Sequence, residues 1–180
     1  MKNIFSISLV WGGIATLIAV VIDVILKFSN AHLYSIGRYG LYFLTISILG
    51  ICIYLAIKKY RDIRFKNKSF LLFQGFSVGA LTSLVYALFF SMYLFILSQT
   101  LLPDMFEKYK KQQIIAIENS SISEAEKQIQ MVSINDMTNG SILIGDFIQR
   151  LIFPLTLSLF IAIFMQRKKS IEHIEKQQNF

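Results

Sequence analysis

Four long apolar segments constrain the fold more than any other feature of the chain. They cover Ile4–Leu26, Ile36–Ile57, Phe70–Leu102 and Ser141–Met165, and a charged or polar break follows each of them. A helix needs about 20 apolar residues to cross a hydrocarbon core of roughly 30 Å. Each segment is long enough, so we predict an all-α integral membrane protein with four transmembrane helices.

The composition agrees with this fold class. Of 180 residues, 54% are hydrophobic and 16% are charged, whereas about 25% of the residues of a soluble domain are charged. The apolar residues are concentrated in the four segments, which leaves no separate soluble core. We therefore predict a single membrane domain over residues 1–180, and we expect the first span to be an uncleaved signal anchor.

Basic residues gather at the ends of the predicted spans and orient the chain. The loop between the second and third spans carries Lys58, Lys59, Arg61, Arg64, Lys66 and Lys68, and Arg167–Lys169 follow the fourth span. The positive-inside rule places this loop, the tail 166–180 and both termini in the cytoplasm. We expect the basic loop to anchor to anionic membrane lipids. The same placement argues against a nucleic-acid partner, despite a net charge of +7.

The segment 103–140 is then extramembrane and on the outer side. It contains six acidic residues against four lysines, the opposite balance to the basic loop. Ser123 and Glu126 have the spacing of a capping box, which marks the start of a helix. We predict two helices, 103–118 and 123–137, that form a hairpin. Pro103 either kinks an extension of the third span or begins a new helix, and Asn139-Gly140 predicts a turn.

Small residues at helical spacing indicate where helices approach closely. Gly75, Gly79 and Ser83 step by four through the third span. Small residues are favoured at helix contacts in lipid because apolar side chains gain little by leaving lipid tails. We interpret this face as packing inside the bundle. A dimerisation face, and with it a homo-oligomer, is the alternative.

Three ionisable residues interrupt the spans. Asp23 lies near the outer end of the first span, and Asp146 and Arg150 lie in the outer part of the fourth. Charges within spans are functional candidates because burying them is costly. Asp146 and Arg150 are four residues apart and share a helix face. For the polar cluster of Asp23, Asp146 and Arg150 we expect a structural role, either as an ion pair or with Arg150 snorkelling to the headgroups. An ion or ligand vestibule is the alternative.

Residues with catalytic or metal-binding chemistry are scarce. The single cysteine, Cys52, lies within a span, and His32 and His173 fall on opposite sides of the membrane. The sequence contains no His-Glu-x-x-His helix, no Gly-x-Ser-x-Gly elbow and no Walker loop. We therefore expect no enzymatic activity, no cofactor and no metal site.

The order and spacing of several short motifs resemble those of a known family. The motifs are Tyr60-Arg61-Asp62, Phe73-Gln74-Gly75-Phe76, Pro103–Tyr109, Ser123–Gln128 and Arg167-Lys168-Lys169. Their order and spacing resemble those of the bacterial membrane proteins catalogued as domain of unknown function 4199, and the resemblance extends over almost the whole chain. The resemblance implies four spans, a helical insertion before the last span and no established activity.

These observations favour a non-enzymatic accessory or scaffold subunit of a bacterial inner-membrane complex. The reason is the combination of a sizeable extramembrane hairpin with the absence of catalytic chemistry. The hairpin would contact other inner-membrane proteins. The alternative is a small oligomeric transporter or channel that uses Asp23, Asp146 and Arg150.

Overall fold

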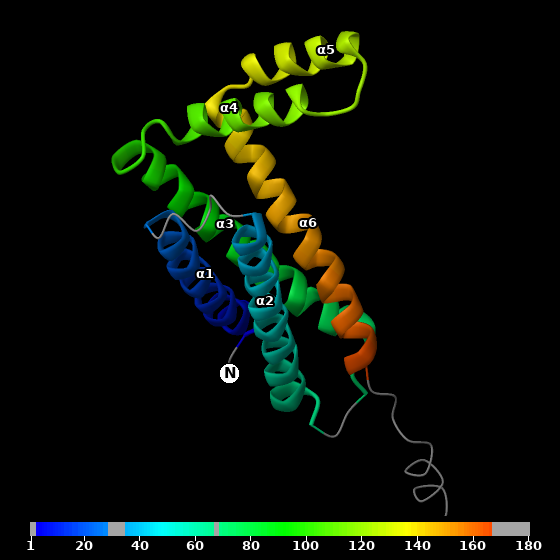
Figure 1. Ribbon diagram of the computed structural model, residues 1–180. Coiled ribbons are helices and arrows are strands. Elements are labelled where there is room, and N and C mark those ends of the chain that lie inside the picture. Colours follow the sequence, from blue (N-terminus) through cyan, green and yellow to red (C-terminus); the bar gives the residue numbers. More distant parts are fainter. Residues whose placement is uncertain (1–2, 29–34, 67–68, 167–180) are drawn as a thin grey trace, which may run out of the picture. The chain divides into compact units, whose positions relative to one another are not determined.

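The computed structural model describes residues 3–28, 35–66 and 69–166, and side chains are described except at 27, 28 and 35–42. These residues form helices α1 (Ile4–Phe28), α2 (Ser35–Arg64), α3 (Leu72–Thr100), α4 (Met105–Glu118), α5 (Glu124–Asn135) and α6 (Asn139–Met165). Figure 1 shows this all-helical architecture. Lys68, the tail from Arg167, His32 and His173 lie outside the described residues.

Four of the helices are long and apolar enough to cross a membrane. The qualifying segments are Ile4–Leu26, Phe43–Arg64, Leu72–Thr100 and Asn139–Met165. Their side chains are mostly apolar, as contact with lipid tails requires. Because each segment is a helix, its backbone polar groups are hydrogen-bonded within the segment. The predicted fold class, four transmembrane helices with a helical hairpin between the third and fourth, is confirmed.

Two differences from the predicted helix boundaries have a clear physical reason. The second helix does not end at Ile57 but continues to Arg64, so most of the predicted basic loop is helical. Lysine and arginine are good helix formers, and no glycine or proline interrupts this stretch. Asn139-Gly140 is not a turn but the start of α6. Thr138 caps this start, because its Oγ1 accepts a hydrogen bond from the Ser141 N–H at 3.1 Å.

The end of α3 resolves the alternatives for Pro103. The helix ends at Thr100, and Leu101 and Leu102 both donate their N–H groups to the carbonyl of Leu97. Pro103 has no N–H to continue the helical ladder. A new helix, α4, begins at Met105, whose N–H bonds to the Leu102 carbonyl at 3.0 Å. The hairpin is therefore separated from the span by a short break.

The contacts divide the chain into two compact units. Unit 1 comprises Met1–Phe90 and Arg150–Phe180, and unit 2 comprises Ser91–Gln149. Helices α3 and α6 contribute residues to both. Compact contact units are not the same as separately folding domains, so the single membrane domain stays a prediction.

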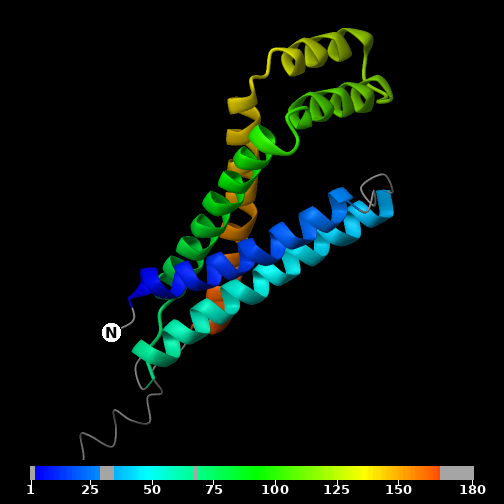
Figure 2. The ribbon, with the colours of Figure 1, turned by 90° about the vertical axis from the view of Figure 1, so that its left-hand side faces the viewer.

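Unit 1 contains α1 packed along α2, as both views of the ribbon show (Figures 1 and 2). Its core combines apolar side chains such as Ile53 and Val78 with the buried hydroxyls of Ser8, Thr82 and Ser83. Cys52 is buried in α2, where it occupies a packing position. The core of this unit is therefore built largely from small and medium-sized side chains.

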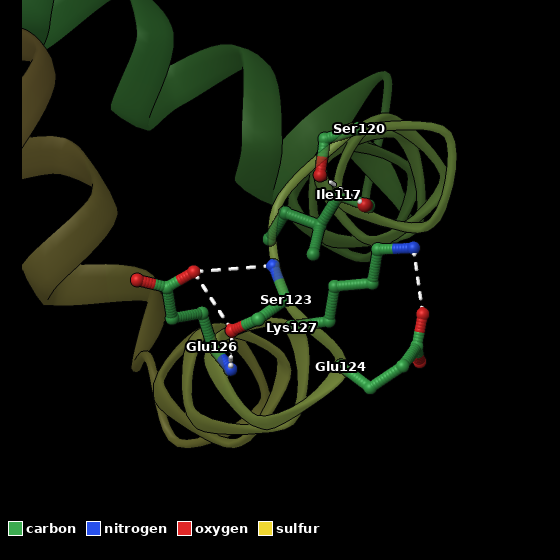
Figure 3. Close-up of polar contacts among 6 residues, drawn as sticks. All are labelled: Ile117, Ser120, Ser123, Glu124, Glu126 and Lys127. Atoms are coloured by element: carbon green, nitrogen blue, oxygen red, sulfur yellow. Dashed lines mark hydrogen bonds and ion pairs between the residues drawn. The ribbon is translucent and has the colours of Figure 1, made fainter.

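Unit 2 contains the hairpin of α4 and α5, which pack against each other. Phe106 and Ile134 are the buried side chains of these two helices. Figure 3 shows the predicted capping box at the start of α5: the Ser123 hydroxyl accepts from the Glu126 N–H, and the Glu126 carboxylate accepts from the Ser123 N–H. Lys127 adds an ion pair with Glu124 at 2.9 Å. Local bonds thus define where α5 begins.

Candidate functional site

Two helices of unit 1, α3 and α6, approach each other closely. A Cβ added at Gly79 would lie only 2.7 Å from the Cβ of Ser158, and one added at Gly75 would lie 3.1 Å from that of Ala162. Ser83 continues the same face, and its Oγ lies 3.2 Å from Ser158 Oγ. Gly75, Gly79 and Ser83 therefore pack against small residues of the same chain.

Hydroxyl groups of α1 bond to backbone carbonyls of α3. Ser8 of α1 donates to the Val78 carbonyl at 3.2 Å, and Thr16 lies 3.4 Å from the Tyr86 carbonyl while also bonding to its own helix. Such bonds between spans contribute about 0.6 kcal/mol each on average. Sequence reasoning did not identify these partners or Ser158. The spacing of Ser158 and Ala162, four apart in α6, was the available signal.

Arg150 is held by two aromatic side chains of α3. Its guanidinium carbon lies 3.9 Å from the centre of the Phe90 ring, and its Nη1 donates to the Tyr86 hydroxyl at 3.5 Å. Both aromatic residues are buried. A guanidinium stacked on a ring is stabilised by the ring's negative face. The sequence singled out Arg150 but gave no indication of these aromatic partners.

The predicted cluster of three charges is distributed over both units. Asp23 and Arg150 belong to unit 1, and Asp146 belongs to unit 2. The side chains of all three are half-buried. Their assembly into a single site stays a prediction.

The basic residues after Ile57 occupy the last turns of α2 and the residues that follow. Arg61 pairs with Asp62 at 3.1 Å, and Lys58, Lys59, Arg64 and Lys66 are exposed. Lys59 Nζ lies 6.0 Å from the centre of the Trp11 ring of α1. Among the residues that the structure describes, Trp11 Nε1 is one of two buried side-chain polar atoms without a hydrogen-bond partner. At this corner of unit 1, where α1 meets the end of α2, the cationic side chain of Lys59 lies beside Trp11, whose indole N–H is unpaired.

The hairpin of unit 2 presents a second kind of surface. An open groove of about 320 Å³ lies between its two helices, and its lining includes Tyr109, Gln113 and Ile117 of α4 and Ser133 of α5. On α5, Ile129 is 70% exposed and Val132 is 61% exposed. These two residues, one turn apart, form an apolar face that no described residue of unit 2 covers.

Metal binding requires converging His, Cys, Asp or Glu side chains. In residues 3–28, 35–66 and 69–166, no group of three such side chains is placed to hold an ion. The absence of metal and cofactor sites from the whole chain stays a prediction.

The helices and their packing define a multi-pass helical membrane protein with an extramembrane helical hairpin. The chain belongs to the family described as protein of unknown function (DUF4199), whose match covers residues 10–167. This match confirms the resemblance seen in the sequence. No curated protein and no solved structure matches the chain significantly.

Proposed function

We propose that the chain is a non-enzymatic accessory or scaffold subunit of a bacterial inner-membrane complex, and that the α4–α5 hairpin binds its protein partner. The observation that carries this proposal is the apolar face of α5 formed by Ile129 and Val132. The hairpin is rich in Glu, Lys and Gln, so we place it in water rather than lipid. Burying one such side chain against a partner would contribute about 1.5–3 kcal/mol.

The groove beside this face supports a protein partner rather than a small ligand. Small-molecule sites enclose most of the ligand surface, whereas this groove is open. Its walls alternate apolar side chains, such as Ile117, with polar ones, such as Gln113 and Ser133. Apolar contacts ringed by hydrogen-bonding groups are typical of protein interfaces.

The charge distribution supports an orientation of the chain in the membrane. The cations at the end of α2 and after α6 in the sequence support, by the positive-inside rule, cytoplasmic termini at both ends of the chain. The hairpin follows the third span and precedes the fourth, so it would then lie outside the inner membrane. Its excess of acidic residues agrees with that side.

Substitution on the apolar face tests the proposal. Ile129→Glu places a charge in the expected interface, and Gln128→Glu adds the same side chain at the exposed neighbouring position. We expect a stoichiometric protein partner to copurify in mild detergent with the wild type and with Gln128→Glu, and to be lost with Ile129→Glu. Equal recovery of the partner with both variants would contradict the proposal.

The contacts of Arg150 bear on the transport alternative. Stacking on Phe90 and the hydrogen bond to Tyr86 support a structural role for the guanidinium. A half-buried cation that is already held by neighbouring groups needs no further ligand to account for its presence. We therefore propose that Arg150 stabilises the bundle.

A further inference from the structure

The corner where α1 meets the end of α2 has the properties of a lipid headgroup site. We propose that Trp11 and Lys59 bind the phosphate of an anionic phospholipid. The site lies entirely within unit 1, so the inference is independent of the scaffold function proposed for the hairpin.

The first argument concerns the unused donor of Trp11. Its Nε1 atom is shielded from solvent and has no hydrogen-bond partner among the described residues. Buried polar groups in folded proteins are nearly always hydrogen-bonded, so an unpaired one is a candidate contact for a ligand. The indole nitrogen is a donor only, so such a ligand must offer a hydrogen-bond acceptor.

The second argument concerns the charge of that acceptor. Lys59 Nζ lies over the Trp11 ring, 6.0 Å from its centre, and the Lys59 side chain is exposed. An ammonium group also only donates. The acid closest in sequence, Asp62, is paired with Arg61. An acceptor that meets these donors is therefore an anion, and a phosphodiester oxygen provides both the charge and the lone pairs.

The third argument identifies the phosphate as that of a lipid. Trp11 lies in a helix that qualifies as a membrane span, and tryptophan is enriched at the headgroup level of bilayers. Val10 and Ile14, which flank Trp11 around the α1 helix, are exposed apolar side chains. These residues offer surface to acyl chains beside the cationic corner. A soluble anion would make no use of them.

Native mass spectrometry of the purified full chain tests the wild type directly. The protein in detergent is offered equal amounts of phosphatidylglycerol and phosphatidylcholine with identical acyl chains. We expect phosphatidylglycerol to be retained preferentially, by about fivefold for one lysine contact near the surface. Inorganic phosphate at millimolar concentration should not displace it. Equal retention of the two lipids would overturn the proposal, and displacement by inorganic phosphate would show an anion site that is not specific for lipid.

Matched variants assign the preference to the two residues. Lys59→Gln removes the ammonium beside the indole, and Lys58→Gln removes the same charge from the adjacent exposed position. Trp11→Phe keeps an aromatic ring but removes the N–H donor. We expect Lys59→Gln and Trp11→Phe to lose most of the preference and Lys58→Gln to keep most of it. Equal effects of the two lysine variants would show a diffuse charge effect and would contradict a site at Trp11.

A fluorescence measurement keeps the proposal falsifiable if a variant does not fold. Trp11 is the only tryptophan of the chain, so its emission reports on this corner without substitution. In phosphatidylcholine nanodiscs that contain a small fraction of brominated lipid, brominated phosphatidylglycerol should quench Trp11 more strongly than brominated phosphatidylcholine at the same fraction. Identical quenching by the two lipids would overturn the proposal.

Discussion

Exposed apolar side chains occur on the spans and on the hairpin, but their surroundings differ. Leu17 of α1 is 67% exposed within a segment that qualifies as a span, and Ile129 of α5 is 70% exposed within a short helix rich in polar residues. Lipid tails solvate the first side chain at no cost, whereas water around the second is unfavourable. The same exposed fraction therefore indicates a lipid-facing surface on one helix and a candidate protein interface on the other.

The interiors of the two regions differ as well. In unit 1, close contacts between Gly79 and Ser158 let helix backbones approach, since apolar burial gives little advantage in lipid. In the hairpin, Phe106 and Ile134 are buried, and the capping box and ion pairs define the helix ends. Substitutions that add volume should affect the first region most, and substitutions that remove a local hydrogen bond should affect the second.

Gly79→Ala gives the largest expected effect and tests the close packing of the spans. The added methyl would overlap Ser158 at 2.7 Å, and because that Cβ is fixed to the α6 backbone, the helices must separate. We expect a loss of about 1–3 kcal/mol in the free energy of unfolding, measured as lower resistance to unfolding in detergent.

Gly13→Ala is the matched control for this prediction. A Cβ at Gly13 meets nothing within 4 Å, although the residue also lies within a span helix. We expect its stability to be unchanged or to rise by up to about 1 kcal/mol, because alanine has the higher helix propensity. Equal losses at the two positions would show that the contact between α3 and α6 does not determine stability.

Arg150→Gln gives a smaller effect and tests whether the charge in the spans is structural. The substitution removes the cation that stacks on Phe90 at 3.9 Å. We expect a loss of about 1–2 kcal/mol, and we expect Phe90→Leu to remove most of the effect of Arg150→Gln in a double-mutant cycle. A variant of unchanged stability that abolishes an ion or solute flux in liposomes would instead support the transport alternative.

Ser123→Ala gives the smallest effect and tests the local stability of the hairpin. It removes the hydroxyl that accepts from the Glu126 N–H (Figure 3). We expect a loss of about 1 kcal/mol, seen as faster amide hydrogen exchange in the first turn of α5 and unchanged exchange in the spans. Ser121→Ala, two residues earlier, is the control. Faster exchange throughout the spans would contradict the separation drawn between the two regions.

The sequence predicted those features that depend on local pattern. The four spans follow from the length of apolar segments, and the capping box follows from the spacing of Ser123 and Glu126. The start of α6 at Asn139 was missed because Thr138, rather than a turn at Asn139-Gly140, satisfies the free N–H groups. Residue propensities alone do not decide whether Asn139-Gly140 ends a helix or Thr138 begins one.

Features that depend on which helices meet were less predictable. The small-residue face of α3 was evident, but its partners Ser158 and Ala162 and the aromatic residues around Arg150 were not. Many arrangements of four apolar helices satisfy the same sequence pattern, since lipid gives little preference among apolar faces. Likewise, the unused N–H of Trp11 becomes evident only when its surroundings are known.

Photocrosslinking in the native cell tests the central claim, that the apolar face of α5 binds a protein partner, most directly. A photoreactive phenylalanine derivative replaces Ile129 in one strain and Leu17, which is exposed on a span, in another. We predict an adduct with one defined protein of a different sequence at position 129 and mainly lipid adducts at position 17. Lipid adducts alone at position 129, or an adduct with a second copy of this chain, would contradict the account.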